Sequence, residues 1–135
     1  MNRVLLIDAD RAASEAFVLG CLGRDVAVHT ADTLCEGVRY ALEVPVSAIL
    51  VDAGLVRLTP AAQADMFEQV APDVPVVVVL KPNAPIEEHV RFELAGFRVM
   101  SRPIEPADLL AKLDLDAAPR PARPGAAERV RALCG

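Results

Sequence analysis

The 135-residue sequence is poor in aromatic residues, in cysteine and in long apolar runs. It has no Trp, and aromatic residues make up only 4% of a chain that is 53% hydrophobic, so a core must be built from Val, Leu, Ile and Ala. The three cysteines, Cys21, Cys35 and Cys134, are odd in number and lack metal-ligand spacing. This pattern favours reduced thiols over a disulfide framework.

No apolar run is long enough to cross a bilayer, since the longest, 74–80, falls far short of a membrane span. The apolar run near the first residue stops at Asp8 and is too short for a secretory signal. We therefore expect a cytoplasmic protein that does not associate with membranes.

Basic residues are also few, and the net charge is −5. Residues 1–115 carry 10 basic and 17 acidic side chains, a net charge of −7, whereas residues 116–135 carry four Arg and two acidic side chains, a net charge of +2. An acidic body argues against nucleic-acid binding by the domain, and the tail is too weakly basic to reverse this.

Short apolar runs alternate five times with segments that carry helix signals, such as the Thr residues that precede the second and third helices. The expected strands are 4–7, 25–30, 47–51, 76–80 and 97–101. The connections are too short for anything but parallel crossovers. We therefore predict an α/β fold: a flavodoxin-like, doubly wound (βα)5 three-layer sandwich around a five-stranded parallel sheet of order 2-1-3-4-5.

The composition changes after Leu115, which suggests a domain over residues 1–116 and a Pro- and Arg-rich linker or tail over 117–135. A short helix over 126–133 would be marginal alone. A frayed tail and a docking segment are the two interpretations of this region.

Acidic residues follow the first and third expected strands. Asp8 and Asp10 come after the first, and Asp52 comes after the third. In an open parallel sheet the carboxyl ends of the strands border the crevice in which ligands bind. We expect the three acids to converge there.

These acids belong to a wider pattern that includes an apolar fourth strand, Ala95-Gly96 at the end of the fourth helix and Arg102-Pro103 after the fifth strand. In order and spacing, residues 3–115 resemble the response-regulator receiver (CheY-like) family. The resemblance implies that a histidine kinase or phosphotransfer protein passes a phosphoryl group to Asp52. It also implies that Mg²⁺ is held by Asp8, Asp52 and the backbone of Gly54, and that Arg102 occupies the position of a phosphate-pairing Lys.

The sequence departs from the family at the residues that do this chemistry. Ala9 replaces the second metal-binding acid, Leu80 replaces a phosphate-binding hydroxyl residue, and Val99 replaces the aromatic switch. Arg102 keeps the charge of the Lys but not its shape. We therefore interpret the chain as a degenerate receiver, a pseudo-receiver that serves bacterial two-component signalling as a phosphorylation-independent protein-interaction module, with no enzymatic activity, no required cofactor and at most weak Mg²⁺ binding.

The alternative is a working phospho-acceptor that autophosphorylates at Asp52. Other interpretations of the same residues make Asp52 a solvated strand-end acid and Asp8 a cap of the following helix. A further hypothesis is that Arg102 pairs with both Asp8 and Asp52 in place of the cation.

The fourth helix carries two apolar faces. Ile86, Val90 and Leu94 share one, and Phe92 and Ala95 lie on nearly the opposite one. The family register favours burying Phe92, which would expose the first face next to Val99 on the fifth strand. In the family this surface of helix four, strand five and helix five binds partners, so we expect a histidine kinase, an effector, an output domain or a second copy there. Scattered exposed apolar residues are the alternative.

Overall fold

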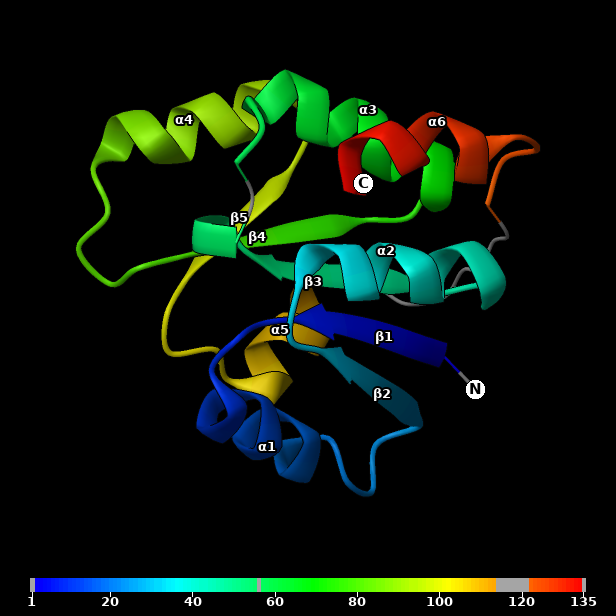
Figure 1. The fold of residues 1–135 in the computed structure, drawn as a ribbon. Coiled ribbons are helices and arrows are strands. Elements are labelled where there is room, and N and C mark those ends of the chain that lie inside the picture. Colours follow the sequence, from blue (N-terminus) through cyan, green and yellow to red (C-terminus); the bar gives the residue numbers. More distant parts are fainter. Residues whose placement is uncertain (1, 56, 114–121, 135) are drawn as a thin grey trace.

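The computed structural model describes residues 2–55, 57–113 and 122–134. Five parallel strands form one sheet of order β2-β1-β3-β4-β5 (Figure 1). This confirms the predicted flavodoxin-like fold and its strand order. The strands are β1 (Asn2–Ile7), β2 (Val26–Ala31), β3 (Ala48–Asp52), β4 (Val76–Leu80) and β5 (Arg98–Ser101).

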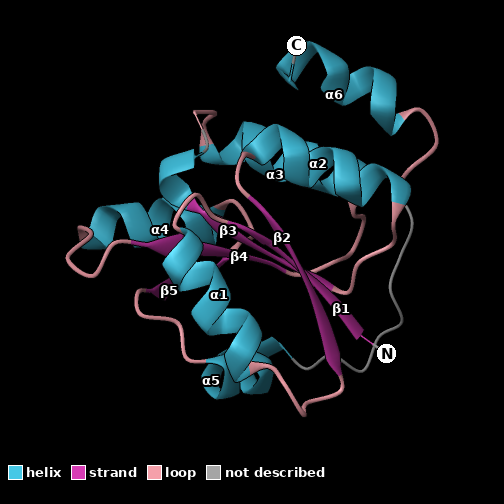
Figure 2. Ribbon diagram, turned by 60° about the horizontal axis from the view of Figure 1, so that its bottom comes forward, coloured by secondary structure: helices cyan, strands magenta, loops and turns pink. Residues whose placement is uncertain are grey.

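Helices cover both faces of the sheet. The helices α2 (Leu34–Glu43), α3 (Pro60–Val70) and α4 (Ile86–Leu94) lie on one face, and α1 (Arg11–Gly20) and α5 (Pro106–Leu113) lie on the other (Figures 1 and 2). Alternate residues of each central strand therefore enter different cores: Leu5 and Ile7 pack on the α2 side, whereas Val4 and Leu6 pack on the α1 side. Burial on both faces explains why these strands are continuous apolar runs.

Threonines begin two of the helices, as expected. The hydroxyl of Thr33 accepts the backbone N–H of Glu36 at 3.2 Å, and that of Thr59 accepts the N–H of Ala62 at 3.2 Å. Such a cap satisfies a backbone donor that has no partner within the helix.

The end of α4 fixes the rotation of that helix. Gly96 adopts a φ of +98°, and the N–H of Phe97 donates to the carbonyl of Phe92 at 3.1 Å, a helix stop that requires a left-handed residue. The rings of Phe92 and Phe97 meet edge to face, 5.9 Å apart. Phe92 is thereby held in the core.

The opposite face of α4 is exposed, as the family register predicts. Ile86, Val90 and Leu94 are 69%, 46% and 83% exposed. Val99 differs from expectation, because its side chain is only 8% exposed and packs in the core on the α2 side. A side chain buried in that core cannot contact a partner that binds to the exposed face of α4. Val99 is therefore not part of the expected interface.

A sixth helix, α6 (Ala126–Cys134), lies outside α2 and α3 and adds a layer there (Figure 2). Ala126 and Val130 are 2% and 3% exposed, and Val130 joins the core on the α2 side. The expected boundary between residues 116 and 117 lies outside the described residues. Apolar burial gives this short helix the stability that its length alone does not provide.

Polar contacts add to the docking of this segment. Arg123 donates to the carboxylate of Glu68 at 2.6 Å, and Arg129 donates to the side-chain oxygen of Gln69 at 2.6 Å. The hydrogen bond from Arg123 lowers the pKa of the Glu68 carboxyl below its ordinary 4.5. Glu68 therefore stabilises the folded state at pH values above its ordinary pKa. This contribution is lost as the pH falls through the lowered pKa of the folded state.

We predict that Val130→Asp releases α6 while the sheet stays folded, because a carboxylate cannot remain in an apolar contact without a partner. Hydrogen exchange followed by mass spectrometry should show loss of amide protection over 126–134 with protection of β1, β3 and β4 retained. Arg131→Ala, at an exposed position of the same helix, is the control and should keep the protection. Unchanged exchange in Val130→Asp would contradict the docking.

Candidate functional site

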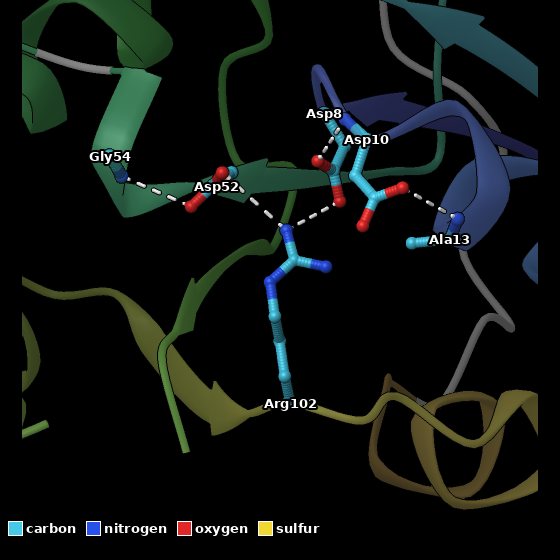
Figure 3. Close-up of polar contacts among 6 residues, drawn as sticks. All are labelled: Asp8, Asp10, Ala13, Asp52, Gly54 and Arg102. Carbon is cyan, nitrogen blue, oxygen red and sulfur yellow. Dashed lines mark hydrogen bonds and ion pairs between the residues drawn. The ribbon is translucent and has the colours of Figure 1, made fainter. Parts of the chain in front are cut away.

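Three charged side chains from distant parts of the chain meet at the carboxyl edge of the sheet. Asp8 follows β1, Asp52 ends β3 and Arg102 follows β5 (Figure 3). The parallel topology brings them together, because adjacent strands finish at the same edge. The acids were expected here from the sequence.

Arg102 bridges the two acids through one nitrogen. Its Nη2 lies 2.5 Å from Asp8 Oδ2 and 3.5 Å from Asp52 Oδ2 (Figure 3). The Arg102 backbone is tied to the sheet, since its N–H donates to the carbonyl of Leu80 at 3.0 Å. The Arg102–Pro103 peptide bond that follows is cis. The hypothesis that Arg102 pairs with both acids is confirmed.

Asp8 is the more buried acid, with a side chain that is 7% exposed. Its second oxygen, Oδ1, accepts the backbone N–H of Asp10 at 2.9 Å. Both oxygens therefore have partners, as a buried carboxylate requires. The cap of α1 is Asp10, whose carboxylate accepts the N–H of Ala13 at 3.1 Å. The interpretation of Asp8 as that cap is wrong, because the helix begins at Arg11 and Asp8 lies too far upstream.

Asp52 is more accessible, with a side chain that is 26% exposed. Its Oδ1 accepts the N–H of Gly54 at 3.1 Å, at the turn from β3 into the short 3-10 helix Ala53–Leu55. The sequence assigned Gly54 a role through its backbone carbonyl, and the contact that the structure gives is through its N–H. This bond orients the carboxylate toward Arg102.

The charge of Arg102 is fixed by its surroundings. Partial burial opposes the charged form of the guanidinium, but the hydrogen bond and charge of Asp8, with smaller contributions from Asp52 and Asp10, raise the pKa of Arg102 above its ordinary value. The contribution of Arg102 to the stability of the folded state is lost only as the pH rises through this raised pKa. The guanidinium is therefore a permanent cation between the acids at every physiological pH.

The acids open into different hollows. Asp52 lines one with the loop 81–85 and Glu88, whereas Asp8 and Asp10 line another with Arg102 and Glu105. Arg102 lines the hollow of Asp8 and Asp10, and its Nη2 also lies 3.5 Å from Asp52 Oδ2. Among the described residues, none lines both hollows.

The replaced residues add no polar group to the site. The side chain of Leu80 is 1% exposed and packs in the core on the α2 side. Ala9 offers no ligand atom beyond its backbone. Lys81, which follows β4 at this edge, is exposed and lines the Asp52 hollow.

These residues do not fit a magnesium ion in the observed arrangement. The carboxylate oxygens that face one another, Asp8 Oδ2 and Asp52 Oδ2, are both directed at the Arg102 nitrogen. A divalent cation between them would lie against a guanidinium, which repels it, and Mg²⁺ requires several oxygen ligands in near-octahedral geometry. Among the residues that the structure describes, no three His, Cys, Asp or Glu side chains form a group that could hold a metal.

Comparisons with known proteins assign the fold. No family model and no curated protein matches the chain. A CheY-like response regulator receiver domain protein from Methanospirillum hungatei JF-1 superposes with a TM-score of 0.72, at 24% identity over 86% of this chain and 94% of that one. The chain has the receiver-domain fold.

Two further structures with this receiver fold differ in state. A response regulator from Burkholderia pseudomallei with a phosphorylated aspartic acid, a calcium ion and citrate matches with a TM-score of 0.72, at 22% identity over 98% of this chain and 72% of that one. The beryllofluoride-activated NtrC4 receiver domain dimer matches with a TM-score of 0.73, at 19% identity over 84% and 94%. At these identities the likeness establishes architecture only.

Sequence reasoning placed Asp8, Asp52 and Arg102 together but missed two features of the site. It did not identify Asp10 as the cap of α1, although an acid one residue before a helix start is a signal for the cap. It also did not foresee that the acids open into separate hollows. The hollows are formed by side chains and loops from several elements, for which the sequence carries no local signal.

We predict that Arg102→Met lowers the free energy of unfolding by about 1–3 kcal/mol, because the buried Asp8 carboxylate loses its charged partner. Asp8→Asn in the same chain should recover part of the loss by removing the unpaired charge. Urea unfolding at neutral pH measures both. Lys81→Met, at an exposed cation beside the same crevice, should stay within about 0.5 kcal/mol. Equal stability of Arg102→Met and the unchanged chain would contradict the bridge.

Proposed function

We propose that this chain is a pseudo-receiver: a phosphorylation-independent protein-interaction module in bacterial two-component signalling, working in the cytoplasm and without enzymatic activity. The observation that carries the proposal is the Arg102 guanidinium, which lies 2.5 Å from Asp8 and 3.5 Å from Asp52. It fills with protein charge the place where a phosphorylated receiver would hold a metal ion.

The chemistry of phosphoryl transfer supports this view. A carboxylate that attacks a phosphoryl group accumulates negative charge, and a divalent cation normally neutralises it. Here a guanidinium already pairs with both acids before any phosphoryl donor arrives, and it cannot offer the open coordination positions of a metal. Displacing Arg102 would also leave the buried Asp8 without its partner, which costs free energy.

The residues that would transmit phosphorylation are also replaced. Leu80 has no hydroxyl to bind a phosphoryl group, and its side chain is buried among apolar residues. Val99 has no ring to swing between two positions and is itself buried. Even a phosphorylated Asp52 would therefore lack the two side chains through which receivers are expected to respond.

The proposed surface for partner binding is the exposed face of α4. Ile86, Val90 and Leu94 form an apolar strip along it, and Glu87, Glu88 and Glu93 lie close by in the same helix. An apolar strip with a charged border is typical of an interaction surface. The proposed partners are a histidine kinase, an effector, an output domain or a second copy of the chain; the NtrC4 receiver domain that shares this fold is a dimer.

A second candidate function is an active phospho-acceptor at Asp52, using Asp8, Arg102 and a weakly held Mg²⁺ near Gly54. One observation favours it: the Asp52 carboxylate is 26% exposed and lines a hollow open to solvent. The similar Burkholderia pseudomallei protein carries a phosphorylated aspartic acid. This candidate requires Arg102 to leave both acids.

Incubation with acetyl phosphate and Mg²⁺, followed by intact-protein mass spectrometry, separates the two candidates. We predict no phosphorylated species in the unchanged chain and no difference between it and Asp52→Asn. The physical reason is that the guanidinium occupies the metal position and no second acid is present at Ala9. Phosphate uptake that disappears in Asp52→Asn would refute the pseudo-receiver.

A gain-of-function variant provides the positive control for the assay. The triple substitution Ala9→Asp, Leu80→Thr and Arg102→Lys restores the receiver-type residues at the three replaced positions. We expect it to take up phosphate, and to stop doing so when Asp52→Asn is added. This outcome would show that the assay detects a working site on this scaffold.

A further inference from the structure

One edge of the sheet is open to strand pairing. β2 (Val26–Ala31) ends the sheet on one side and pairs only with β1 (Figure 1). Over its six residues it contains no Pro, Lys, Arg, Asp or Glu. Natural edge strands usually carry such residues because they discourage pairing with another chain.

The outward backbone groups of β2 can be assigned from the ladder. The carbonyl of Ala31 accepts the N–H of Asp8 at 3.0 Å, so Ala31 faces β1. Backbone groups alternate in direction along a strand, and those of Val28 and Thr30 therefore point away from the sheet. In the part of the chain that the structure describes, no hydrogen bond reaches these outward groups.

The opposite edge of the sheet is protected. At β5, the Lys112 ammonium donates to the outward carbonyl of Val99 at 3.1 Å. The Arg98 guanidinium donates to the carbonyl of Lys112 at 2.8 Å and fixes the end of α5 beside this strand. A Lys over an edge is a device against strand addition. The contrast identifies β2 as the available edge.

We propose that β2 pairs with β2 of a second copy of this chain, antiparallel about a two-fold axis at Val28, to form one continuous sheet through both copies. Val28 then exchanges two hydrogen bonds with its counterpart, and the Thr30 N–H donates to the second copy's Val26 carbonyl. The Val26 N–H already donates to the Arg24 carbonyl within its own chain. The inference does not rest on the proposed function.

Charge supports this occupant and this direction. Arg24 lies two residues before Val26, and Asp32 lies two residues after Thr30; both are exposed. In the antiparallel register each Arg24 faces the second copy's Asp32. A parallel arrangement would instead place like charges opposite one another, which is destabilising.

Apolar surface lies beside the same edge. Leu19 and Leu22, at the end of α1 and in the turn that leads to β2, are 65% and 69% exposed. Leu19 also lines a groove between α1 and the β2 edge together with Val18 and Thr30. A second copy joined at β2 would cover part of this groove, and removing apolar area from water favours association.

Sedimentation velocity of the full chain over a range of concentrations tests the proposal. The chain should form a dimer, and Thr30→Pro should weaken it about tenfold or more, equivalent to about 1.4 kcal/mol. Proline removes an N–H that points outward and leaves the β1 ladder intact. Thr30→Ala keeps that N–H and is the matched control. Circular dichroism checks that each variant is folded.

A charge-exchange cycle tests the register even if Thr30→Pro folds poorly. Arg24→Asp and Asp32→Arg should each weaken the dimer, and the double variant should restore it, which a general loss of stability could not do. Leu94→Glu, on the exposed face of α4, should leave it unchanged. Two results would overturn the proposal. One is a monomer at all concentrations, which would leave the edge to a peptide of another protein. The other is a dimer that is insensitive to Thr30→Pro and lost in Leu94→Glu.

Discussion

The bridge from Arg102 to Asp8 and Asp52 is the interaction on which this molecule's chemistry depends. A parallel sheet collects the ends of its central strands at one edge, and here two of those ends carry carboxylates. One of them, Asp8, has a side chain that is only 7% exposed and requires a counter-charge. Because the counter-charge comes from a side chain of the same chain, it is always present. A metal ion would instead bind and leave, and would keep coordination positions open for a ligand.

The surrounding fold holds this bridge in place. The central strands are buried on both faces, and the backbone of Arg102 is hydrogen-bonded to the end of β4. Asp10 caps α1 and gives its own N–H to Asp8, so the start of that helix and the buried acid stabilise each other. Farther from the site, α6 adds a layer outside α2 and α3 through Val130 and the contacts of Arg123 and Arg129. The site and the added layer lie in separate regions, and they can be altered separately.

Much of this architecture could be predicted from the sequence because it depends on local patterns. Strands such as β4 are uninterrupted apolar runs, Thr33 and Thr59 precede their helices, and an Asp after each of two strands marks the crevice. The rotation of α4 followed from the resemblance to receivers, whose register favours burying Phe92, because the apolar pattern alone left both faces of the helix open. What failed depended on three-dimensional detail: Asp10 rather than Asp8 caps α1, and Val99 points into the core. The docking of α6 depends on long-range contacts with Glu68 and Gln69, for which a short segment carries no periodic signal.

The central claim is that protein charge has taken the place of the metal, and a magnesium titration followed by NMR tests it most directly. The amide signals of Asp8, Asp52 and Gly54 report on the site because their backbone or side-chain groups take part in its contacts. We predict that millimolar Mg²⁺ leaves these signals unshifted in the unchanged chain. Localised shifts that saturate with Mg²⁺ concentration at these residues would show that Arg102 yields the site to a metal, and would contradict the account.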